Sequence, residues 1–171
     1  MTEGTIPSIL AKQDWPRIIG AALGYRGGQE RELCKQLKTE LRSNGIECGS
    51  PTIPSRRLLV DIGPKYPSEK EWPFVIEVKF FRTRKNHSMR TKEAGSLIFD
   101  FVKVALCPAK ARYVLLVTDQ EMKNYLQNNI PELLSGQQLP ITFPDLHIAA
   151  SYEAIVDESR FSIIVYSVIT K

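Results

Sequence analysis

The sequence has few cysteines and no long apolar run. Its three cysteines, Cys34, Cys48 and Cys107, are scattered over 171 residues. They form no close pair with metal-ligand spacing, so we expect reduced thiols in a cytoplasmic protein rather than disulfides or a zinc site. No apolar stretch is long enough to span a bilayer, and no basic start precedes an apolar segment at the N-terminus. We therefore expect neither contact with a membrane nor a secretory signal.

The composition is that of a folded domain with an uneven distribution of charge. Hydrophobic residues make up 43% and charged residues 25%, which argues against disordered and collagen-like proteins. A chain of 171 residues predicts one domain with its own core. The net charge is +4, but residues 121–171 carry 3 Lys and Arg against 6 Asp and Glu. The first two thirds are therefore basic, which fits a polyanionic partner.

Hydrophobic periodicity predicts a mixed α/β domain. Residues 1–27 form a helical extension in which Pro16 lies in the first turn of a short helix. The core (residues 28–130) and a β-containing C-terminal elaboration (131–171) follow. Helices are expected at about 29–44, ended by Gly45, at 92–106, capped by Thr91, and at 120–129, capped by Asp119. Strands are expected at 58–62, 74–81, 112–118 and 161–169, with Gly63-Pro64 ending the first.

The order of these elements indicates a mixed central sheet flanked by helices. The strands at 58–62 and 74–81 are close enough in sequence to be antiparallel neighbours, whereas the strand at 112–118 requires a helical crossover. This arrangement is an α/β sandwich. The strand at 161–169 either completes the sheet or closes a homodimer interface.

Charged side chains interrupt the two early strands. Phe74, Ile76, Val78 and Phe80 share an apolar face of their strand, and the opposite face carries Glu77 and Lys79. In the strand at 58–62, Leu58, Val60 and Ile62 share one face, and Asp61 lies on the other. If the strands pair, Asp61 and Glu77 lie on one side of the sheet with Lys79 beside them. Such carboxylates raise each other's pKa unless a divalent cation relieves the repulsion. A sheet face carrying only salt bridges is the alternative.

The preceding helix offers a third carboxylate. Glu30 lies seven residues before Leu37, about 20° short of two full turns, so it projects along the apolar stripe of the helix. It could reach the same site, or it could simply favour the helix dipole from the first turn. Glu32 is off the apolar stripe, and we expect it to face water.

These residues resemble the PD-(D/E)xK nuclease superfamily. The matching features are Asp61, fifteen residues, and then Glu77-Val78-Lys79. The stretch from Gly28 to Leu33 is similar to the first helix of archaeal Holliday-junction resolvases. The residue before Asp61 is Val60 rather than proline, and residues 65–73 form a longer linker than in compact resolvases. The resemblance covers about residues 28–130.

The resemblance implies a fold and a mechanism. The fold would be restriction-endonuclease-like, with an αβββαβ core. Asp61, Glu77 and the backbone carbonyl of Val78 would hold Mg²⁺ or Mn²⁺, and Glu30 would complete or support the site. Lys79 would position the attacking water. The reaction would be hydrolysis of a DNA phosphodiester by an endonuclease, leaving 5′-phosphate and 3′-hydroxyl ends.

A basic segment follows Lys79 directly. Cations at a strand end beside a metal site fit a phosphate backbone running past it, although a charge run can also be a solvated loop. The candidate DNA contacts are Arg82, Arg84, Lys85, Arg90 and Lys92, together with Arg56 and Arg57 before the Asp61 strand. No base-reading element is recognisable. The alternative functions are a catalytically inactive nuclease-fold module that binds nucleic acid or protein, and a plain α/β interaction protein.

Overall fold

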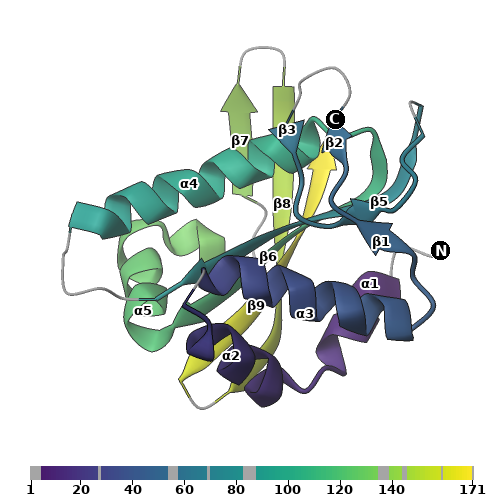
Figure 1. Ribbon diagram of the computed structural model, residues 1–171. Coiled ribbons are helices and arrows are strands. Elements are labelled where there is room, and N and C mark those ends of the chain that lie inside the picture. The colour runs from purple at the N-terminus through teal and green to yellow at the C-terminus, as the bar shows by residue number, and fades with distance from the viewer. Residues whose placement is uncertain are drawn as a thin grey trace.

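A computed structural model describes residues 5–26, 28–53, 58–68, 70–82, 88–134, 139–143, 146–158 and 160–170. Five α-helices and one short 3-10 helix surround the sheets in this part of the chain (Figure 1). The helices are α1 (Thr5–Ala11), α2 (Trp15–Gly24), α3 (Gln29–Ser43), α4 (Ser88–Ala105), α5 (Gln120–Asn129) and η1 (Pro131–Leu134). None of these helices is long and apolar enough to cross a membrane.

The main sheet has five strands in the order β5-β6-β9-β8-β7. Its strands are β5 (Trp72–Phe81), β6 (Ala109–Asp119), β7 (Leu139–Phe143), β8 (Leu146–Glu158) and β9 (Phe161–Thr170). Strands β5 and β6 are parallel, as the α4 crossover predicts, and the other pairs are antiparallel. The mixed α/β class is therefore confirmed. The tail strand β9 completes the sheet between β6 and β8 rather than standing at a free edge.

Helices α3 and α4 cover opposite faces of β5 and β6 (Figure 1). Phe74, Ile76, Val78 and Phe80 pack against the α3 side, as the alternation predicts. The odd-numbered residues of β5 face α4, where Val75 joins a second apolar cluster. Glu77 and Lys79 therefore belong to the α4 face. Each face of the sheet has its own buried core, and the charged residues lie within one of them.

Helix α3 ends where the sequence predicts, but one of its side chains is buried where exposure was predicted. Gly45 has φ +79°, a left-handed conformation that suits glycine at a helix end. Glu32 was expected in water and is instead 7% exposed, so that prediction is wrong. Helix α2 packs on α3 in the part of the chain that was expected only to be a helical extension. Glu32 accepts a 2.7 Å hydrogen bond from Gln36 and lies 3.5 Å from Nζ of Lys35.

The predicted strand at 58–62 is not continuous. Four two-residue strands form two small antiparallel sheets, β1-β4 and β2-β3. They are β1 (Cys48–Gly49), β2 (Thr52–Ile53), β3 (Leu58–Leu59) and β4 (Gly63–Pro64). Gly63-Pro64 pairs with β1 instead of ending a strand.

The break in this segment moves its side chains off a common face. Val60 packs in the α4-side cluster and Ile62 in the α3-side cluster, so the prediction that they share a face is wrong. Only Ile62 pairs with β5, through an antiparallel bridge to Ile76. Asp61 therefore lies in a bend at the edge of β5 rather than on a strand face.

Helix α4 begins earlier than expected. The sequence predicted Thr91 as the N-cap of a helix starting at Lys92, but α4 starts at Ser88. Thr91 is therefore inside the helix. The end of the helix is close to the prediction, and Asp119 caps α5 as predicted by accepting a 2.9 Å hydrogen bond from the N–H of Met122.

Candidate active site

Two carboxylates accept hydrogen bonds from backbone N–H groups at the free edge of β5. Strand β5 is the outermost strand of the five-stranded sheet, and the backbone N–H and C=O groups of Ile76, Val78 and Phe80 point to the edge away from β6. The backbone of Ile76 exchanges hydrogen bonds of 3.0 and 2.8 Å with Ile62. Beyond it, the N–H of Val78 donates to Oδ2 of Asp61 at 2.9 Å. The N–H of Phe80 points to Oε2 of Glu30 at 3.5 Å.

The carboxylates of Asp61 and Glu30 thus occupy positions that the backbone of a further strand, paired with the edge of β5, would occupy. Alternate residues on a strand are about 7 Å apart, which sets the spacing of the two bonded amides. The N–H and C=O of one strand residue point to the same edge, so the carbonyl of Val78 also faces the open edge. The carbonyl predicted as a metal ligand therefore faces the same edge as the two carboxylates.

Glu77 lies beside this edge and is deeply buried. It is 2% exposed, and its Oε2 lies 3.4 Å from the backbone N of Asp61. Its Oε1 forms an ion pair with Nζ of Lys103 from α4. Burial and the nearby Asp61 raise the pKa of Glu77 to about 8, outweighing Lys103, which lowers it. Two carboxylates that repel each other in this way are suited to share a cation.

Lys79 is held between two carboxylates. Its Nζ lies 3.6 Å from Oε1 of Glu30 and 3.2 Å from Oδ2 of Asp100 on α4. That oxygen is buried and has no partner in hydrogen-bond geometry among the described residues. Burial raises the pKa of Asp100 to about 6, although Lys79 lowers it. Burial also raises the pKa of Glu30, and Asp61 adds to this effect.

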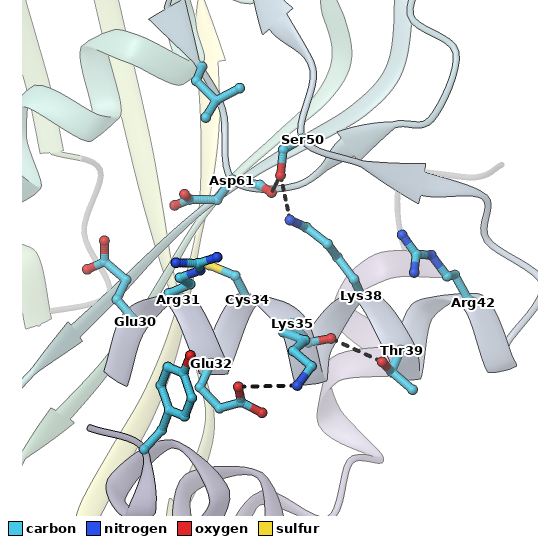
Figure 2. A pocket seen from close by; sticks show the side chains of 12 residues that line it. Glu30, Arg31, Glu32, Cys34, Lys35, Lys38, Thr39, Arg42, Ser50 and Asp61 are labelled. Carbon is cyan, nitrogen blue, oxygen red and sulfur yellow. Dashed lines mark hydrogen bonds and ion pairs between the residues drawn. The ribbon is translucent and has the colours of Figure 1, made fainter. Parts of the chain in front are cut away.

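A cleft of about 820 Å³ opens between α3 and the segment carrying Asp61. Figure 2 shows the carboxylates of Glu30 and Asp61 at one end of it. Glu77 and Lys79 are not among its lining residues. A ligand in the cleft would meet Glu30 and Asp61 first, with Glu77 and Lys79 behind them.

The four predicted catalytic residues therefore gather at one end of β5. Their donor set is hard oxygen, which fits Mg²⁺ or Mn²⁺. Asp61, Glu77 and the Val78 carbonyl are the residues that would hold the ion. Glu30 is turned instead toward Lys79 and Phe80. No group of three or more His, Cys, Asp or Glu side chains in the described ranges is arranged as a metal centre.

Most of the predicted DNA contacts fall outside the part of the chain that the structure describes. Arg56, Arg57, Arg84 and Lys85 lie outside the described residues, as does the side chain of Arg90. Arg82 and Lys92 are exposed on either side of this gap.

The sequence interpretation missed Asp100 and Lys103. Asp100 lies three residues after Leu97 and four before Val104, both of which are fully buried. It therefore falls on the apolar stripe of α4, and a charged residue at such a position signals a buried ion pair. Lys103 follows three residues later, on the same side of the helix.

Comparisons with protein-family models, curated proteins and solved structures found no match to this chain. The functional interpretation therefore rests on the residues of the site.

Proposed function

We propose that this protein is a metal-dependent DNA endonuclease with a restriction-endonuclease-like core. The observation that supports this most directly is the convergence of Glu30, Asp61, Glu77 and Lys79 from three separate segments. This is the residue set of the PD-(D/E)xK pattern. The αβββαβ order is also compatible with the mixed sheet.

The acidic residues have the properties that binding of a divalent cation requires. The N–H of Asp61 donates to the carboxylate of Glu77, and the carboxylate of Asp61 accepts from the N–H of Val78, the residue after Glu77. The carbonyl of Val78 faces the same edge of β5. A bound divalent cation would supply charge neutralisation at a phosphodiester and activation of water. The carboxylates supply its ligands, and the cleft gives a substrate access to Asp61 and Glu30.

Lys79 would act as a fixed cation. Burial alone lowers the pKa of Lys79, but Asp100 and Glu30 outweigh burial, so the pKa is raised. Lys79 is therefore protonated at neutral pH. Its ammonium group can orient the attacking water and stabilise charge that develops on the phosphate.

The same ion pairs support a second candidate function. Glu77 lies beside Lys103 and Lys79 beside Asp100, so each of these carboxylates has a lysine partner when it is ionised, and this face does not require a metal to balance its charge. This favours a nuclease-fold module that binds nucleic acid or a protein without cleaving it. The two functions differ in one measurable property, since only the enzyme requires the metal.

The deciding experiment is cleavage of a DNA panel. Linear duplex, supercoiled, single-stranded and four-way-junction DNA are incubated with the protein in Mg²⁺, Mn²⁺ or EDTA. Cleavage that requires metal and falls about 100-fold or more in Glu77→Gln supports the enzyme. Glu71→Gln is the matched control, because Glu71 pairs with Lys110 at the opposite end of β5.

Calorimetric titration with Mn²⁺ completes the test. Heat of binding that disappears in Asp61→Asn supports a metal site. Absence of both metal binding and cleavage would contradict the proposal and favour the inactive module.

A further inference from the structure

The cleft beside Asp61 has a cationic wall on α3. Arg31 and Lys38 line it and are seven residues apart, so they lie on the same side of the helix about 10 Å apart along its axis. Figure 2 shows both side chains rising from α3 toward Asp61, with Cys34 between them. The sequence interpretation placed the DNA-binding charges elsewhere and did not consider these two.

These two cations are not neutralised by a carboxylate within the described part of the chain. The ion pairs found there involve neither Arg31 nor Lys38. Lys38 donates to the hydroxyl of Ser50, which donates to the carbonyl of Asp61 at 2.8 Å. Lys38 is therefore held next to Asp61 by neutral partners, and its ammonium charge is available to bind an anionic ligand.

The other two cations that line the cleft have local structural partners. Lys35 lies 3.5 Å from Glu32, and the guanidinium of Arg42 donates to the carbonyl of Cys48 at 2.8 Å. Lys35 is thus paired with a carboxylate, and Arg42 lies at the end of α3 away from Glu30 and Asp61 (Figure 2). Arg31 and Lys38 are therefore the cations of the cleft that have no carboxylate partner among the described residues and that lie beside Asp61.

Two apolar side chains line the same cleft. Tyr25 is 43% exposed and Leu59 60% exposed, and they are two of the six large hydrophobic residues in the described chain that are at least 36% exposed. Exposed aromatic and aliphatic groups in a cationic groove match the way proteins bind unpaired bases. Bases in a duplex have their faces covered by stacking, so they would not offer this contact.

We infer that the cleft binds a single strand of DNA, with phosphates on Arg31 and Lys38 and bases against Tyr25 and Leu59. This deepens the proposed function and rests on it for the choice of DNA. The cleft volume of about 820 Å³ is within the range that is usual for ligand-binding clefts in proteins. A strand lying there would pass Asp61 and Glu30.

Fluorescence anisotropy in EDTA tests this without cleavage. The probes are a labelled DNA of ~12 nucleotides, the duplex of the same sequence and the matching RNA. We expect the single-stranded DNA to bind more tightly than either. Arg31→Gln and Lys38→Gln should each weaken it several-fold and reduce the slope of log affinity against log salt by about 0.7. Lys110→Gln, which removes an equal charge at the far end of β6, is the control.

The aromatic contact is tested separately. Tyr25→Ala should weaken binding about 5-fold or more, and Tyr25→Phe should restore it, because the ring rather than the hydroxyl makes the contact. Equal or tighter binding of the duplex, or an equal loss in Lys110→Gln, would overturn the inference. Tighter binding of RNA would overturn the choice of DNA. Strand binding without metal-dependent cleavage would contradict the proposed nuclease and leave this inference standing.

Discussion

Nζ of Lys79 lies 3.2 Å from Oδ2 of Asp100, a carboxylate on α4, the helix that covers the Glu77 and Lys79 face of the sheet. Glu30 approaches the same ammonium group from α3, at 3.6 Å. The cation is thus fixed from two helices on opposite faces of β5. Its position depends on the packing of α4 as much as on the strand that carries it.

Asp100→Asn should reduce DNA cleavage about 10-fold with little change in substrate binding. The asparagine keeps the shape of the side chain but removes the charge that raises the pKa of Lys79. The alkaline limb of the pH–rate profile should therefore move to lower pH. Steady-state kinetics from pH 6 to about 11.5 checks this, because the pKa of Lys79 in the wild type lies above its ordinary value of 10.5. A variant with reduced rate but an unmoved alkaline limb would show that Asp100 acts on stability alone.

The stability of the metal-free protein should fall between about pH 4 and pH 8. The pKa of Glu77 is raised from 4.5 to about 8, and that of Asp100 from 3.8 to about 6. Both groups hold protons more tightly in the folded chain, so folding is favoured at low pH and loses this contribution as pH rises through the folded values. Urea unfolding in EDTA should show a loss of several kcal/mol in the free energy of unfolding over this range.

The double variant Glu77→Gln/Lys103→Met provides the comparison. It replaces a charged pair by neutral groups of similar size, so neither partner is left as an isolated buried charge. Its stability should depend less on pH than that of the wild type. An unchanged pH dependence would mean that Glu77 does not titrate in this range.

Mg²⁺ should stabilise the protein more at pH 8.5 than at pH 6. Glu77 must lose its proton to serve as a ligand, and its raised pKa makes this costly in acid. Thermal melts at saturating Mg²⁺ should show a midpoint increase of about 2–4 °C at pH 8.5 and less at pH 6. NaCl at matched ionic strength controls for screening. Equal stabilisation of Asp61→Asn would exclude the proposed ligands.

Gly63→Ala should displace Asp61. A Cβ atom at Gly63 would lie 2.6 Å from Cγ of Pro51, a ring that cannot turn away like a flexible side chain. Gly63 is two residues from Asp61 and pairs with Gly49 in β1-β4. We expect a loss of about 1–3 kcal/mol in stability and a larger relative loss of metal affinity. Gly95→Ala, where a Cβ meets nothing within 4 Å, is the control.

The sequence predicted the elements whose periodicity was strong. Helix α3, strand β5, the parallel β6 and the capped α5 all lie where hydrophobic spacing and capping residues placed them. In each case one local rule fixes the element and tertiary packing agrees with it.

The Asp61 segment was predicted less well, because its conformation is set by its neighbours. Val60 alternates with Ile62 in the sequence as strand residues do, yet the N–H of Val60 donates to the carbonyl of Pro51, and within this segment only Ile62 exchanges backbone–backbone hydrogen bonds with β5. Such a local change of partner leaves no periodic signal. The prediction for Glu32 was wrong for a similar reason, since α2 packs on α3 and the periodicity of α3 alone does not indicate that a second helix covers it.

Asp100 and Lys103 were visible in principle but were not recognised. The pattern of the PD-(D/E)xK motif draws attention to strands, whereas these residues lie on the helix that follows. A charge at a buried helical position is the more general signal, and it needs no resemblance to be noticed.

The middle position of β9 has a consequence for shortened versions of the protein. Residues 161–170 satisfy the backbone of β6 on one side and of β8 on the other. A chain that stops before Phe161 would present two bare strand edges flanked by apolar side chains, and such edges pair readily with other molecules. We therefore expect a shortened chain to accumulate as insoluble aggregates, even though Glu30, Asp61, Glu77 and Lys79 all lie before residue 80.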